Sequence, residues 1–139
     1  MRQDSTPAQL YATVFGAVLL IVGIAGFFVN ARFGTGSDPA GDDLLLFEVN
    51  GWHNIVHIAS GLAGLTLARS PAGARAFALG FGVVYGLVTV YGLIAGTNIL
   101  GLLAINGADN VLHLLIAAAG IAAYAASRSA RPEPEPRAA

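Results

Sequence analysis

The chain has 139 residues, of which 55% are hydrophobic and only 11% are charged, and it contains no cysteine. Soluble domains carry roughly 25% charged residues, so a free cytosolic enzyme of this composition would expose large apolar patches and aggregate. A formal net charge of −1 removes the electrostatic basis for nucleic-acid binding, and the lack of cysteine excludes disulfides and thiolate metal sites. The composition therefore favours an integral membrane protein.

Four apolar stretches are long enough to form helices that cross a bilayer, which takes about 20 residues each. They are predicted at about 8–29, 51–68, 76–95 and 108–126. We expect an all-α fold, a four-helix transmembrane bundle within residues 1–130. The apolar stretches 44–49 and 99–105 are expected to lie along the membrane interface or to re-enter it slightly. The proline-rich end, 131–139, is expected to be a disordered tail.

The arginines gather on one side of this arrangement. Six of the seven flank the chain ends or lie between the second and third segments, and only Arg32 falls on the other side. Cytoplasmic loops carry the excess of basic residues. A multi-pass cell-membrane protein with both termini in the cytoplasm is therefore predicted. The lipid bilayer is its expected partner, a second membrane protein or a homo-oligomer is left open, and nucleic acid is not expected.

The two halves of the chain resemble each other. Residues 44–57 (LLLFEVNGWHNIVH) match residues 100–113 (LGLLAINGADNVLH) at a shift of 56 positions. A weaker match at a shift of 66 pairs Phe15 with Phe81, each followed by glycine. These matches predict two tandem helical hairpins related by an axis along the membrane normal. The second and fourth helices should then face each other or occupy equivalent places around that axis.

Both matching segments contain an Asn-Gly pair. Asn50 and Asn106 are good helix N-caps, and the glycine after each allows the chain to turn tightly. Capping is the favoured interpretation of these pairs. Trp52 is typical of the interfacial aromatic belt, and Glu48 is expected to face water or to pair with Arg32.

Polar residues recur at spacings of three and four on the second and fourth segments, which places each set on one helical face. The two sets are Asn50, His53, Asn54 and His57, and Asn106, Asp109, Asn110 and His113. Polar side chains inside a bilayer are costly and usually point into the bundle. We therefore expect one polar cluster in the outer half of the membrane, opening toward the outer face.

Three interpretations of this cluster stay open. The side chains can simply hydrogen-bond the helices together, as in a structural or accessory membrane subunit. They can also hold a metal ion such as zinc, with the ligands His53, His57, Asp109 and His113 supported by Asn50, Asn54, Asn106 and Asn110. Alternatively, His57 and His113, which are related by the repeat, can be axial ligands of a haem or another tetrapyrrole.

An enzymatic role is the weakest of the function classes considered. A zinc-dependent membrane hydrolase could be assembled from Ser60, a histidine and Asp109. No recognisable nucleophile motif accompanies these residues, so we assign no catalytic residue from the sequence.

The paired N-x-x-H elements, Asn54 to His57 and Asn110 to His113, are the most distinctive motifs of the chain. With the Asn-Gly-Trp-His run at 50–53 before the first of them, they resemble a family of small four-helix bacterial membrane proteins, domain of unknown function 4383. The resemblance covers the chain from the first helix to the fourth. It implies an integral-membrane location and a four-helix layout, and it brings no activity, cofactor or substrate.

Overall fold

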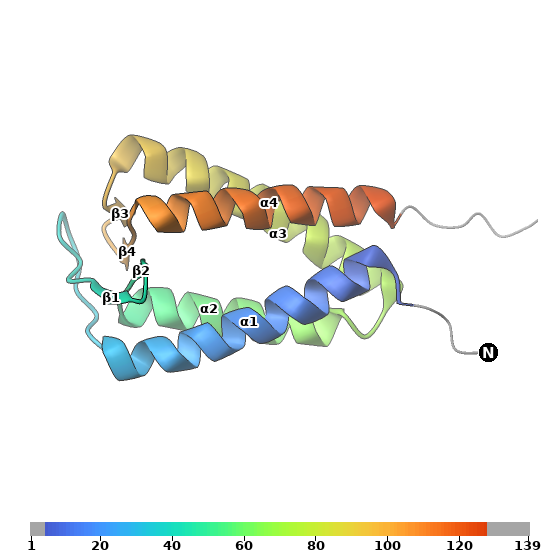
Figure 1. Cartoon of the computed structure of the whole chain (residues 1–139), viewed down its shortest axis with the longest axis horizontal. Helices are drawn as coiled ribbons and strands as arrows, with labels where there is room; N and C mark the ends of the chain where they lie inside the picture. The colour runs from blue at the N-terminus through green and yellow to red at the C-terminus, as the bar shows by residue number, and fades with distance from the viewer. Residues whose placement is uncertain (1–4, 128–139) are drawn as a thin grey trace, which may run out of the picture.

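The computed structural model describes residues 5–127, which form four α-helices and two short β-hairpins (Figure 1). The helices are α1 (Pro7–Val29), α2 (Gly51–Leu67), α3 (Pro71–Ala95) and α4 (Gly107–Ala126). In the hairpins, β1 (Asp42–Leu44) pairs with β2 (Phe47–Val49), and β3 (Asn98–Ile99) pairs with β4 (Leu103–Ala104), both antiparallel. The predicted four-helix, essentially all-α fold is confirmed, while the expected tail, 131–139, lies outside the described residues.

Helix α3 begins earlier than the sequence predicted, at Pro71 instead of about residue 76. Its N-cap is Ser70, whose Oγ accepts a hydrogen bond from the Gly73 N–H at 3.1 Å. Proline suits the first helical position, because the N–H that it lacks would have no helical partner there. The serine and proline thus start the helix ahead of its apolar stretch.

The two hairpins were not predicted, because their turns carry little of the usual turn chemistry. Leu45 and Leu100 have φ angles of 62° and 55°, in the left-handed region where residues other than glycine are uncommon. Of the residues in the two turns, Gly101 (φ 68°) is the one glycine with a positive φ. The stretches 44–49 and 99–105 therefore read as plain apolar runs, although each contains a complete reversal of the chain.

Three of the helices, α1, α3 and α4, are long and apolar enough to cross a membrane. Helix α2 has 17 residues, which is about 25 Å at 1.5 Å per residue, and it carries many of the polar side chains. Large apolar side chains cover the outside of the bundle; Phe28 is 88% exposed and Ile94 is 83% exposed. Side chains of this kind need lipid around them, so the structure is that of a membrane protein.

The helices pack as two antiparallel pairs, α1 with α2 and α3 with α4. The pairs meet near the start of α1 and the end of α4, and they diverge toward the hairpins (Figure 1). We call these ends the terminal end and the hairpin end. The apolar core extends from the terminal end to the middle of the bundle, and its members are Ala8, Tyr11, Ala12, Ala74, Phe77, Ala78, Tyr85, Ile116 and Ala117.

Close helix contacts recur at equivalent positions of the two pairs. A Cβ on Gly16 of α1 would lie 2.9 Å from the Leu65 backbone nitrogen of α2. A Cβ on Gly82 of α3 would lie 3.0 Å from the side chain of Ile121 of α4. Small residues let membrane helices approach closely. The related positions differ by 66 on α1 and α3 and by 56 on α2 and α4, which supports the predicted internal repeat.

Candidate metal centre

Three histidines meet between the helix pairs toward the hairpin end. One ring nitrogen from each of His53, His57 and His113 lies within 4.8 Å of the other two. The ring centroids of His53 and His57 are 4.3 Å apart, and those of His53 and His113 are 6.1 Å apart. All three side chains are buried. The structure thus brings together three of the four metal ligands that the sequence suggested.

The caps of α2 and α4 set the depth of these histidines. Asn50 Oδ1 accepts a hydrogen bond from the His53 N–H at 3.0 Å, and Asn106 Oδ1 accepts from the Ala108 and Asp109 N–H groups at 2.9 and 3.1 Å. The predicted capping roles are therefore confirmed. Because each cap fixes the first residue of its helix, His57 and His113 come to lie two turns inside.

The His53 ring is held by two backbone carbonyls. Its Nδ1 lies 2.9 Å from the Ala104 oxygen and 3.0 Å from the Glu48 oxygen. Both neighbours can only accept, so Nδ1 carries the ring proton and Nε2 keeps its lone pair. Histidines that bind metals commonly donate their other ring N–H to a carbonyl or carboxylate in this way.

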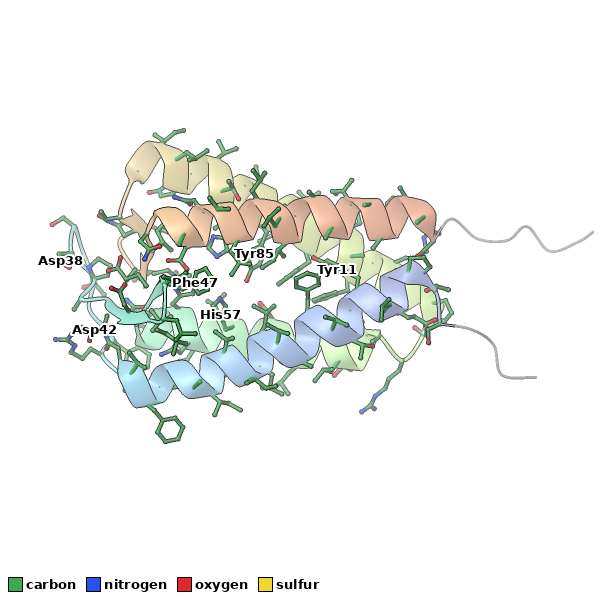
Figure 2. The ribbon with its side chains drawn as sticks, viewed as in Figure 1. Tyr11, Asp38, Asp42, Phe47, His57 and Tyr85 are labelled. Carbon is green, nitrogen blue, oxygen red and sulfur yellow. The ribbon has the colours of Figure 1, made fainter. Side chains whose placement is uncertain are left out.

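The other two histidines have unpaired ring nitrogens. Nδ1 of His57 and Nδ1 of His113 are both buried without a hydrogen-bond partner among the described residues. Buried polar atoms are almost always paired in folded proteins. Figure 2 shows His57 in the interior between the two helix pairs. The Tyr85 ring packs edge-on against that of His113, with centroids 5.0 Å apart.

Asp109, the fourth predicted ligand, is engaged elsewhere. Its Oδ2 accepts hydrogen bonds from the N–H groups of Glu48 and Asn106, both at 2.9 Å. These bonds complete the capping box of α4 and attach strand β2 to it. Asp109 stands in the first helical turn, where unpaired backbone N–H groups lie within reach of its carboxylate.

Asn54 and Asn110 pack against the neighbouring helix of their own pair. Asn54 Nδ2 donates to the Asn30 carbonyl at 2.8 Å, and its Oδ1 lies where a Cβ on Gly26 would be. Asn110 Oδ1 likewise lies where a Cβ on Gly92 would be. The structure shows a packing role for these asparagines, and their predicted role in supporting metal ligands stays a prediction. The shift of 66 that relates Gly26 to Gly92 is the sequence signal that could have indicated the packing role.

The capping asparagines also tie the two hairpins together. Asn50 Nδ2 donates to the carbonyls of Leu102 at 2.7 Å and Pro39 at 3.0 Å. Asn106 Nδ2 donates to the Leu46 carbonyl at 3.0 Å. Each cap thus reaches the hairpin of the other half. The histidine cluster is covered at this end by a cross-linked layer of β-structure.

Asp38 and Asp42 lie at the margin of this layer (Figure 2). Arg32 Nη2 binds Asp42 Oδ2 at 2.8 Å, so the pair with Glu48 that we considered is not the one that forms. Partial burial raises the pKa of the Glu48 carboxyl, and the negative charge of Asp109 raises that pKa further. Asp42 is the closer partner because it sits on the exposed edge of β1.

A family model described as a domain of unknown function (DUF4383) matches residues 9–126, which include nearly all of the four helices. The chain belongs to the DUF4383 family. This finding confirms the resemblance suggested by the paired N-x-x-H elements. Neither the curated proteins nor the solved structures that were compared with the chain gave a match. The function of this DUF4383 protein must therefore be argued from its own site.

Two cavities flank the histidines in this DUF4383 protein. The first, which we call the α2–α3 cavity, has a volume of about 190 Å³, and His53 and His113 form part of its lining. The α1–α4 cavity has a volume of about 260 Å³ and includes His57, Asp109 and His113. Most of the remaining lining is apolar. Three imidazoles with space beside them can bind a first-row metal ion and leave one coordination position open.

Proposed function

We propose that this protein binds a first-row transition metal ion such as Zn²⁺ within the membrane through His53, His57 and His113. The observation that best supports this proposal is the hydrogen bonding of the ring nitrogens of the three histidines. His53 has its proton held on Nδ1 by two carbonyls, and the other two rings each bring a buried, unpaired nitrogen. The largely apolar bundle interior offers these nitrogens few alternative partners.

The spacing of the nitrogens fits such an ion after a small contraction. A tetrahedral ion with bonds of about 2.0–2.1 Å places its nitrogen ligands about 3.3 Å apart. The three nitrogens already lie within 4.8 Å of one another. A contraction of at most about 1.5 Å between the nitrogens would bring them to that spacing. Asp109 stays on the backbone N–H groups in this arrangement, so the fourth position is free for an exogenous ligand.

The geometry favours a metal ion over a tetrapyrrole. Pockets for drug-sized ligands measure roughly 300–1,000 Å³, and both cavities are smaller than that. The His53 ring, with its centroid 4.3 Å from that of His57, also fills space that a flat macrocycle on His57 would need. We therefore place His57 and His113 together with His53 around one ion.

Elemental analysis of the protein purified in mild detergent and loaded with Zn²⁺ tests the proposal. We expect about one equivalent in the parent protein and in Asp109→Asn, and at least a tenfold weaker Zn²⁺ affinity in His57→Ala and His113→Ala. Gel filtration and circular dichroism check that each variant is folded. A parent protein without stoichiometric metal, combined with a lower stability of both histidine variants, would instead assign the cluster to a structural role in holding the helices.

We also propose that the hairpin end faces the outside of the cell membrane and that both termini are cytoplasmic. Arg69 lies between α2 and α3 and Arg75 lies near the start of α3, both at the terminal end, whereas Arg32 lies at the hairpin end, as do Asp38, Asp42 and Asp43. Because the chain has no cysteine, Ser37→Cys and Ser70→Cys can be labelled without background. An impermeant maleimide should modify Ser37→Cys in intact cells and Ser70→Cys only after lysis; the reverse pattern would overturn this orientation.

A further inference from the structure

The two cavities beside the histidines are lined by equivalent positions of the two halves. On α1 and α3, which are related by a shift of 66, the linings match residue for residue at three positions. These pairs are Phe15 and Phe81, Val18 and Val84, and Val22 and Val88. His57 and His113, related by a shift of 56, contribute in the same way. The cavities are thus two versions of one site.

Their polar side chains differ. Where the α1–α4 cavity has Leu19 and Ile116, the α2–α3 cavity has Tyr85 and Ser60 at the equivalent positions. Tyr85 and Ser60 both line the same cavity. Hydroxyl groups cost free energy inside a bilayer and are found there mainly where they meet a partner. One of the two related cavities therefore carries a pair of hydrogen-bonding groups that the other lacks.

The size and the access of the α2–α3 cavity restrict its ligand. An engineered apolar cavity of about 150 Å³ binds benzene, so a volume of about 190 Å³ accommodates one six-membered ring with small substituents. Helix α2 packs far less closely on α3 than on α1. Val84, on the α3 wall, is 53% exposed to the surroundings of the bundle. A ring can therefore enter from the lipid and leave a hydrocarbon tail outside.

We propose that the α2–α3 cavity binds the ring of a membrane-soluble quinone. The aromatic and aliphatic wall of Phe81, Val84 and Val88 contacts the faces of the ring. The hydroxyls of Tyr85 and Ser60 donate hydrogen bonds to one of its carbonyl oxygens, and its tail extends between α2 and α3 into the bilayer. This assignment stands on the cavity lining and does not depend on the metal ion proposed above.

The test uses a decyl-substituted benzoquinone and the full chain in nanodiscs, with binding measured by calorimetry on metal-free protein. A matched pair of variants compares the two cavities, because Val84→Trp obstructs the α2–α3 cavity and Val18→Trp obstructs the equivalent place in the other. We expect saturable binding in the parent protein, at least a tenfold loss of affinity in Val84→Trp and less than a twofold change in Val18→Trp. Tyr85→Phe removes one donor and should weaken binding about three- to tenfold.

Three results would overturn the proposal. The first is uptake of the quinone that does not saturate, and the second is an equal loss of quinone affinity in the two tryptophan variants. The third is displacement of the quinone by decanol at the same concentration as by a competing quinone, which would identify a groove for alkyl chains. If Val84→Trp does not fold, the double variant Ser60→Ile with Tyr85→Leu gives the cavity the residues of its counterpart and should lose binding. Zinc content measured on a separate, zinc-loaded sample of each variant separates a failure of this proposal from a failure of the metal site.

Discussion

The α1–α2 pair and the α3–α4 pair use the same contacts for packing and different residues at their cavities. Asn54 fills the space beside Gly26 in the first pair, and Asn110 fills the space beside Gly92 in the second. The equivalent asparagine oxygens are both buried and unpaired within the part of the chain that the structure describes. Positions that hold a helix pair together are therefore alike in the two halves.

The two halves differ where side chains reach the middle of the molecule. His53 of α2 corresponds to Asp109 of α4, and the first joins the histidine cluster while the second caps a helix. Tyr85 of α3 corresponds to Leu19 of α1. Packing contacts at equivalent positions thus accompany a site whose residues differ between the halves. The comparison separates residues that serve packing from residues that serve chemistry, and substitutions at equivalent positions can test that separation.

The largest effect on stability is expected from alanine at the two glycines that face asparagine. In Gly26→Ala and Gly92→Ala the new methyl group overlaps Asn54 Oδ1 and Asn110 Oδ1, and we expect each variant to lose about 2–3 kcal/mol of unfolding free energy. The free energy of unfolding in mixed micelles measures this loss. Gly80→Ala is the control, because its Cβ meets open space and should cost almost nothing. A large loss in only one half would contradict equivalent packing.

Substitutions of the two capping asparagines should lower the stability of the protein by different amounts. Asn50 is fully buried and bonds to one N–H and two carbonyls, whereas Asn106 is less buried and donates to a single carbonyl. We expect Asn50→Ala to cost about 2–3 kcal/mol and Asn106→Ala about 1–2 kcal/mol. Asn50→Asp keeps the cap but places a buried carboxylate oxygen against the carbonyl oxygens of Pro39 and Leu102, so it should cost at least as much as Asn50→Ala. Equal costs at Asn50 and Asn106 would show that the ties between hairpins contribute little.

The smallest effect concerns Glu48, whose counterpart in the other hairpin is Ala104. Burial and the Asp109 charge raise the pKa of Glu48 above its ordinary value, so the folded protein binds this proton more tightly than the unfolded chain does. Its contribution to stability therefore increases as the pH falls through the raised pKa, and the charged form is unfavourable at neutral pH. Glu48→Gln should increase the free energy of unfolding by up to about 0.5 kcal/mol at pH 7, and it should remove the dependence of stability on pH that Glu48 causes. Unchanged pH profiles would contradict the shift.

Much of the fold could be predicted from the sequence because a membrane simplifies the problem. Long apolar runs must become helices in lipid, so α1 and α4 begin and end within about a residue of their predicted bounds. The Asn-Gly pairs identified the caps of α2 and α4. The start of α3 was placed too late, because Ser70 and Pro71 begin the helix ahead of its apolar stretch.

The sequence by itself determined the membrane environment, the four helices, the family and the set of residues from which a site could be built. Those features depend on local composition and spacing, which lipid and helix geometry convert directly into structure. Only the tertiary structure decided that Asp109 and Asn54 serve the backbone and helix packing while His53, His57 and His113 meet. The reason is that backbone N–H and carbonyl groups of the two hairpins lie next to Asp109 and His53, whereas Asn54 faces the end of α1.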